Sequence, residues 1–344
     1  MAFPDGIADF RSDTVTRPTP EMRKAMSEAE VGDDAYGEDP TVNRLQEACA
    51  ALLGKEAALF VPSGTMANQL AIMTQTNRGE EFICDEGAHV KNFERGAASA
   101  LSGVAPRAVS APGGRVTSEQ IAEVMGSAGK HFPPISLVVW ENSHNLSGGQ
   151  VVPPEILQSG IQEARRHGLS VHLDGARIFN AAIYLGIEAA EIAEGSDTVQ
   201  FCFSKGLGAP VGSILCGSDA LIARARNLRK MLGGGMRQAG VLAAAAEVAL
   251  SNRGRLEEDH RSARYLADSF NNRVEGCVSI ESVHTNIVNV DPRALPRSIP
   301  DTLDALRAVG VKANAPIGKM WRLVTHQDVN NQDVDRLVAA VFET

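Results

Sequence analysis

The sequence predicts an α/β protein with a mostly parallel sheet in a large first domain and a smaller α+β domain after it. Between residues 58 and 251, short apolar runs alternate with helical patterns, as they do in βαβ units. From about residue 251, a long charged helix and fewer strands replace this alternation. The length of 344 residues also favours two domains, at roughly 150 residues each. We expect an N-terminal arm and large domain over residues 1–250 and a small domain over residues 251–344.

The elements of the large domain follow from apolar runs and from amphipathic or alanine-rich stretches. The first apolar run is broken by Pro62, Ser63 and Gly64, and a helical pattern follows it. Strands are expected at residues 58–61, 81–84, 135–140, 169–173, 199–203 and 213–216, and helices at residues 65–74, 154–167, 219–231 and 237–251.

The elements of the small domain begin with a charged helical pattern and continue with β-like runs. They are expected as a helix at residues 255–272, strands at 278–282 and 286–290, a helix at 300–309, a strand at 320–324 and a helix from residue 331. The composition of the sequence shows no flexible linker between these elements and the large domain, so the two domains are expected to pack closely.

Charge and composition exclude several classes of protein. The 33 basic and 42 acidic side chains give a net charge of −9, which argues against a nucleic-acid partner. There is no run of about 18 apolar residues, so no membrane span is expected. The start, MAFPDGIADF, lacks the apolar core of a signal peptide. The five cysteines form no CxxC pair, so we expect no metal site and a cytoplasmic location.

Three local patterns carry chemistry. Asp174 ends an apolar strand, where a side chain faces the ligand crevice of a parallel sheet, although an Asp there can also simply cap a helix. Lys205 follows the next strand among glycines; burial there would free a nucleophilic amine, whereas a solvated loop lysine is the plainer interpretation. Residues 62–68 form a small-residue turn that opens a helix and can hold a phosphate. In this order on an α/β frame, the three predict a pyridoxal phosphate (PLP) site.

A longer set of motifs resembles the threonine aldolase branch of the β-eliminating lyase family, which belongs to the fold-type I PLP-dependent enzymes. The resemblance runs from about residue 9 to residue 340. Its pieces are RSDTVTRP at 11–18, DAYGEDPT at 34–41, SGTMAN at 63–68, His89, ENSHN at 141–145, HLDGAR at 172–177, SKGLGAPVGS at 204–213, RKMLGGGMRQ at 229–238 and WRLVTH at 321–326.

The resemblance implies a large domain with a mostly parallel seven-stranded sheet and assigns residues to the cofactor. Lys205 would hold the PLP aldehyde as an imine, Asp174 would pair with the ring nitrogen, and His89 would stack on the ring. His172, two residues before Asp174, is expected to be a core or supporting histidine. The cofactor-binding set is Ser63, Gly64, Thr65, His89, Asp174, Arg177, Ser204, Lys205, Lys230 and Arg237, with Arg237 reaching the phosphate of a neighbouring subunit.

The resemblance also implies the substrate and the assembly. The expected reaction is cleavage of a β-hydroxy-α-amino acid such as threonine to glycine and an aldehyde. His144 is the candidate for the base or for the group that orients the hydroxyl, and a water or His89 could share that role. A homo-oligomer is expected, a dimer at least and a tetramer by family habit. Another PLP reaction on the same fold, β-elimination or transamination, stays open, as does a non-enzymatic ligand-binding protein. The substrate-binding set is Ser12, Tyr36, His144, Arg177 and Arg322.

Overall fold

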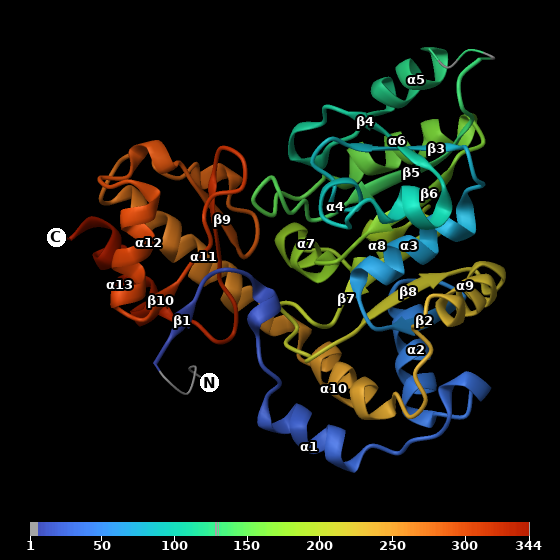
Figure 1. Cartoon of the computed structure of the whole chain (residues 1–344), viewed down its shortest axis with the longest axis horizontal. Helices are drawn as coiled ribbons and strands as arrows, with labels where there is room; N and C mark the ends of the chain where they lie inside the picture. The colour runs from blue at the N-terminus through green and yellow to red at the C-terminus, as the bar shows by residue number, and fades with distance from the viewer. Residues whose placement is uncertain (1–5, 128, 130, 344) are drawn as a thin grey trace.

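The computed structural model describes residues 6–127, 129 and 131–343. The first five residues of the segment MAFPDGIADF therefore lie outside the described part. Figure 1 shows two neighbouring parts, one built on the large sheet and one formed mainly by the chain after residue 251. The helix α10 (Gly240–Ser251) precedes the second part. None of the helices in the described ranges is long and apolar enough to cross a membrane.

The large sheet has seven strands in the order β2-β8-β7-β6-β5-β3-β4. The strand β8 runs antiparallel to both neighbours, and every other adjacent pair of described strands in this sheet is parallel. A mostly parallel seven-stranded sheet is therefore confirmed. The strands are β2 (Ala57–Val61), β3 (Glu81–Asp85), β4 (Ala105–Val109), β5 (Ile135–Glu141), β6 (Ser170–Asp174), β7 (Thr198–Cys202) and β8 (Ser213–Gly217).

Helices cover both faces of this sheet (Figure 1). Successive strand residues point to opposite faces, so in β2 Phe60 joins one apolar cluster and Leu59 joins another. The cluster with Leu59 is closed by α3 (Gly64–Gln75) and α9 (Asp219–Met231). The larger cluster is covered by α2 (Pro40–Leu52), α5 (Ser118–Ser127), α6 (Pro154–Arg166), α7 (Ile178–Leu185), α8 (Ala189–Ala193) and α10. The helix α1 (Pro20–Glu28) packs on α10. The short helix α4 (His89–Asn92) follows β3.

The C-terminal part has its own apolar cluster and two small sheets. In one sheet β9 (Ile287–Val290) pairs antiparallel with β11 (Trp321–Val324). In the other, β1 (Ala8–Asp9) from the N-terminal arm pairs parallel with β10 (Val311–Lys312), and Phe10 packs in this C-terminal cluster. The expected boundary between a large domain at residues 1–250 and a small domain at residues 251–344 remains a proposal. The helices here are α11 (Leu256–Asn271), α12 (Ile299–Ala308) and α13 (Asn331–Phe342).

Two expected elements differ from the structure. The predicted strand at residues 278–282 is wrong: Val278 forms only an isolated bridge to Val290, and Ile280–Ser282 is a 3-10 helix. The reason is that the Asn271 side chain forms hydrogen bonds with both the N–H and the C=O of Val278, the groups that a strand would have used to pair with a neighbour. The helix predicted from residue 237 begins at Gly240, whose N–H donates to Asp39 Oδ2 at 2.8 Å.

Candidate active site

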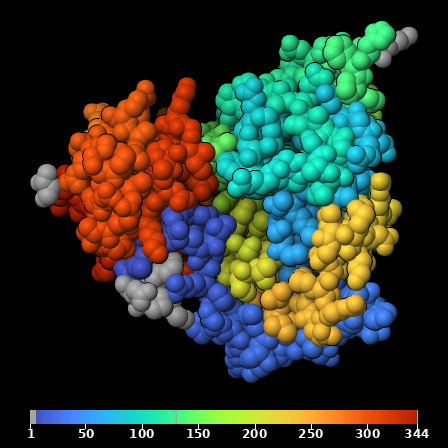
Figure 2. Space-filling view, in the orientation of Figure 1, coloured from blue at the N-terminus to red at the C-terminus, as the bar shows by residue number. Residues whose placement is uncertain are grey.

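The predicted lysine and aspartate lie at the carboxyl edge of adjacent parallel strands. Asp174 is the last residue of β6, and Lys205 lies in the loop after β7. Figure 2 shows a hollow between the orange C-terminal part and the cyan part of the chain, with yellow-green segments at its floor. Ligands of α/β proteins bind outside the carboxyl ends of the strands, so this edge is where a site is expected.

Asp174 is buried and fully engaged as a hydrogen-bond acceptor. Its Oδ2 accepts from Asn68 Nδ2 at 2.7 Å, and its Oδ1 accepts from Gln200 Nε2 at 2.5 Å and from the N–H of Ala176 at 3.1 Å. Burial alone would raise the pKa of Asp174, but the charges of His89 and Lys205 outweigh it and lower the pKa. The carboxylate is therefore ionised and able to pair with a cationic ring nitrogen.

Asn68 links Asp174 to a buried histidine, as the period-two placement of His172 suggested. Because both amide hydrogens of Asn68 serve as donors, its Oδ1 accepts from His172 Nε2 at 3.0 Å. His172 Nδ1 lies 2.8 Å from Thr198 Oγ1. Burial lowers the pKa of His172 to about 4, so the ring is neutral and acts as support.

His89 begins α4 and faces the same carboxylates. Its Nδ1 lies 2.9 Å from Oε1 of Glu94, whose side chain is fully buried, and its backbone N–H donates to Glu141 Oε2 at 2.7 Å. Polar atoms of His89, Glu94 and Asp174 all lie within 4.8 Å of one another, a spacing that could hold a metal ion. Asn68 and Gln69 already donate to Glu94, and Asn68 also donates to Asp174, so the group is better described as a hydrogen-bonded network.

Two guanidinium groups meet near the N-terminal arm. Arg177 is bound by Asp13 through Nε–Oδ2 and Nη2–Oδ1 contacts of 2.7 Å each. Arg322 on β11 donates to Asn145 Oδ1 at 2.6 Å. Burial first, and then the nearby charge of Arg177, lower the pKa of Arg322. The buried Arg177 and the half-buried Arg322 share one local carboxylate, which leaves positive charge for an anionic group such as the predicted substrate carboxylate.

His144 lies in the chain that follows β5, and protein atoms surround both of its ring nitrogens. Its Nδ1 is 2.8 Å from Ser147 Oγ, and its Nε2 is 3.1 Å from Asp85 Oδ2, although the angle of the second contact is poor for a hydrogen bond. The residue is 1% exposed. Burial lowers the pKa of His144, but Glu141 and Asp85 outweigh it and the net direction is upward. His144 Nε2 thus lies within ion-pairing distance of Asp85 beside the site.

The start of α3 has the features of a phosphate cradle. A Cβ at Gly64 would lie 2.7 Å from Cys202 Sγ, so only glycine fits there. Ser213 Oγ, 3.7 Å from the same point, is buried and has no hydrogen-bond partner in the described part of the chain. Ser63 caps the helix by accepting from the N–H of Met66. Thr65 follows in the first turn, whose N–H groups and dipole favour an anion.

The remaining predicted residues divide into two groups. Ser12 accepts from the N–H of Thr14 beside Asp13, and Ser204 precedes Lys205. Lys205 Nζ makes no hydrogen bond with another described residue. By contrast, Tyr36 and Lys230 are exposed, and Arg237 pairs with Asp33 at 3.2 Å. Within one chain, no described contact joins this second group to Lys205, Asp174 or His89.

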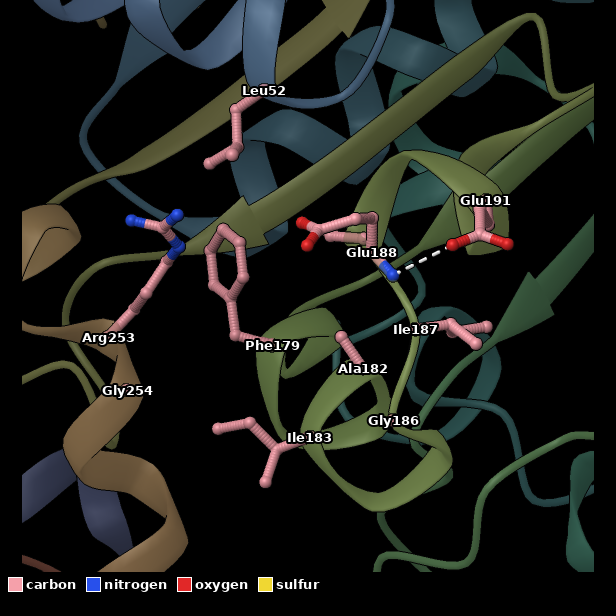
Figure 3. A pocket seen from close by; sticks show the side chains of 11 residues that line it. Leu52, Phe179, Ala182, Ile183, Gly186, Ile187, Glu188, Glu191, Arg253 and Gly254 are labelled. Atoms are coloured by element: carbon pink, nitrogen blue, oxygen red, sulfur yellow. Dashed lines mark hydrogen bonds between the residues drawn. The ribbon is translucent and has the colours of Figure 1, made fainter.

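A separate cavity of about 390 Å³ lies between α7, the loop before α8 and the start of the C-terminal part (Figure 3). Phe179, Ala182 and Ile183 form its apolar wall, with Arg253 and Glu188 at the sides. None of the predicted site residues lines it. Two of the predicted residues, Lys205 and Arg177, line a second and much smaller cavity of about 10 Å³.

A buried carboxylate, a lysine with no hydrogen-bond partner among the described residues and a helix start beside an unpartnered hydroxyl lie at the carboxyl edge of a mostly parallel sheet, an arrangement typical of an α/β enzyme with a cofactor cleft. The sequence relationships agree with this class. The chain belongs to the β-eliminating lyase family, whose model matches residues 9–294.

Relatives of known name are similar over nearly the whole chain. A protein of Arabidopsis thaliana named as a probable low-specificity L-threonine aldolase is 43% identical, over 97% of this chain and 96% of its own length. The low specificity L-threonine aldolase of Escherichia coli K12 is 42% identical, over 97% and 98%. The threonine aldolase structure from Leishmania major has a TM-score of 0.80 at 22% identity, covering 97% of this chain and 98% of that one. The expected fold-type I class is confirmed.

Proposed function

We propose that this chain is a PLP-dependent aldehyde-lyase that cleaves L-threonine, L-allo-threonine and related β-hydroxy-α-amino acids reversibly to glycine and an aldehyde. The observation that carries the proposal is the meeting of Asp174, Lys205 and the Arg177–Arg322 pair at one edge of the sheet. The low-specificity L-threonine aldolases that resemble this chain over nearly their full length support the substrate class.

The residues present fit PLP. Lys205 would bind its aldehyde, Asp174 its ring nitrogen and His89 its ring face, while Gly64, Thr65 and the unpartnered Ser213 Oγ would lie with its phosphate. When bound, PLP supplies an electron sink for the bond that breaks at Cα. Ser63, which caps the same helix, and Ser204, which precedes Lys205, would belong to the same cofactor-binding set.

The side chains of this protein orient the substrate and move a proton. Arg322, Ser12 and the Nη1 edge of Arg177 bind the α-carboxylate, because Asp13 occupies the other edge of Arg177. Holding the carboxylate fixes the direction of the Cα–Cβ bond. The β-hydroxyl must then lose its proton, and His89 and His144 are the two imidazoles that the sequence assigns to this step.

We further propose a homo-oligomer, as a dimer of dimers, with a cytoplasmic location. The exposure of Tyr36 and Lys230 and the surface position of Arg237 support a role in the pocket of a neighbouring subunit. A single chain that is fully active at low concentration would contradict this arrangement.

The purified protein with PLP is expected to release acetaldehyde and glycine from L-threonine. The measurement is a coupled assay for acetaldehyde run beside one for pyruvate and ammonia from L-serine, with L-allo-threonine and L-phenylserine as further substrates. Lys205→Ala should no longer release the aldehyde. Treatment with borohydride should also no longer attach PLP covalently to the chain, because the lysine that forms the imine is absent. Pyruvate and ammonia as the main products would favour a β-elimination lyase instead. A colourless protein that does not respond to PLP would favour ligand binding without catalysis.

A further inference from the structure

The two ring nitrogens of His89 lie in different surroundings. Nδ1 is 2.9 Å from Oε1 of Glu94, a carboxylate with a fully buried side chain. Nε2 has no hydrogen-bond partner in the described part of the chain, and the side chain is 29% exposed. Oε1 of Glu94 also accepts from Asn68, so we assign the hydrogen of this contact to Nδ1, which donates it to Glu94. Nε2 is left for a ligand in the cleft.

Glu94 is itself held in place from the other side. Asn68 Nδ2 donates to its Oε1 at 2.8 Å and Gln69 Nε2 donates to its Oε2 at 2.6 Å, both from the first turns of α3. With Nδ1 of His89, three nitrogen groups surround this buried carboxylate and occupy both of its oxygens. The N–H of His89 is also bound, by Glu141. The imidazole is therefore fixed at its backbone and at one ring nitrogen.

His144 lies in the opposite situation. Ser147 lies against its Nδ1, and Asp85 lies 3.1 Å from its Nε2. At 1% exposure, neither nitrogen is free to face a substrate. Of the two histidines, His89 has the arrangement of a base oriented by a carboxylate.

We propose that Glu94 is a positioning residue: by accepting the hydrogen on Nδ1 of His89, it holds the lone pair of Nε2 toward the cleft, where Nε2 takes up the β-hydroxyl proton. This rests on the proposed aldolase function. The O–H electron pair becomes the second C=O bond of the aldehyde, and the pair of the broken Cα–Cβ bond stays with Cα. Cα gains a proton when glycine forms, and the imidazole returns to its neutral form, so the protons balance.

The charges that face His89 define the expected pH behaviour. Glu94, Asp174 on β6 and Glu141 on β5 favour the protonated ring, while burial and Lys205 oppose it, and the net pKa is raised. Removing the Glu94 charge therefore lowers the pKa of His89. A base must be unprotonated to act, so the acid limb of kcat/KM should move to lower pH.

The test compares Glu94→Gln with Glu86→Gln in the PLP-loaded enzyme. Glu86 is exposed in the same segment, and its replacement removes the same charge. We expect Glu94→Gln to lower kcat about 10- to 100-fold, with little change in KM for L-threonine, and to shift the acid limb to lower pH. Glu86→Gln should behave as the parent. Equal kcat and pH profiles for the parent and Glu94→Gln would overturn the proposal.

A double variant separates positioning from folding. In a His89→Phe background, Glu94→Gln should cost almost no further activity, because Glu94 acts through His89. A further 10-fold loss in that background would overturn the proposal. Histidine ¹⁵N spectra of the enzyme without substrate should show Nδ1 of His89 protonated, and Glu94→Gln should change that signal and lower the pKa of the ring. This readout needs no aldolase activity, so its failure is distinct from failure of the proposed function.

Discussion

Replacing Asp13 by alanine is expected to lower the free energy of unfolding by about 3–5 kcal/mol and to abolish turnover of L-threonine. Asp13 is fully buried and binds Arg177 through two hydrogen bonds of 2.7 Å each. Asn286 Nδ2, from the C-terminal part, donates to the same carboxylate at 3.2 Å. Alanine would leave the Arg177 charge buried without a partner and free it to turn away from the substrate carboxylate.

The loss should not depend on pH near neutrality. Burial alone would raise the pKa of Asp13, but Arg177 and Lys205 outweigh it and hold the pKa well below its usual range. The contribution of such a group is fully present above its unfolded pKa of about 4 and is lost only as pH falls through the lower folded value. Thermal unfolding of parent and variant should therefore differ equally at about pH 6 and about pH 8.

A second replacement tells stability and function apart. Adding Arg177→Met to Asp13→Ala removes the unpaired charge, so most of the lost stability should return while the activity stays absent. Asp291→Asn serves as the control, because Asp291 pairs with the exposed Arg293 and its loss should leave the melting temperature unchanged. A stable and active Asp13→Ala variant would show that Arg177 needs no anchor.

The elements that the sequence predicted well are those whose signals are local. The apolar run from residue 135 becomes β5. Helix α9 begins and ends where its pattern does, and Ser218 caps its first turn. The edge strand β4, with Pro106 and Arg107, was not predicted, since an edge strand needs no continuous apolar run. The strand expected at residues 278–282 failed because the Asn271 side chain competes with a strand partner, and apolar periodicity says nothing about that contact.

The residues of the candidate site also fall into those with a local sequence signal and those that only the fold brings together. Lys205 and Asp174 could be found because Asp174 ends an apolar strand and Lys205 closely follows one, positions visible in a single segment of sequence. Glu94, Asn68 and Gln200 were missed as functional residues because their partners are distant: Asn68 and Asp174 are 106 positions apart. Gln200 had one usable signal, a polar side chain inside the otherwise apolar strand β7. Asp13 was quoted within a motif, yet only the fold brings it to Arg177.

Asp174→Asn is expected to lower kcat for L-threonine by about 100- to 1,000-fold while the protein remains folded. Asparagine keeps the shape of the side chain but carries no charge to hold a cationic ring nitrogen. The affinity for PLP should fall as well, and the absorbance of the bound cofactor should change. Asp197→Asn is the matched control, because Asp197 lies beside the amino end of β6, where it accepts from the N–H of Val171.

The hydrogen bonds around Asp174 predict the cost of this change to stability. Both carboxylate oxygens accept, Oδ2 from Asn68 and Oδ1 from Gln200 and the N–H of Ala176. An asparagine amide has one accepting oxygen, so its NH₂ must face Asn68 or Gln200, and one donor loses its partner at a cost of about 1–3 kcal/mol. A small fall in melting temperature with a large fall in kcat is the expected pair of results. Parent-like kcat and PLP affinity in Asp174→Asn would remove Asp174 from the proposed cofactor site.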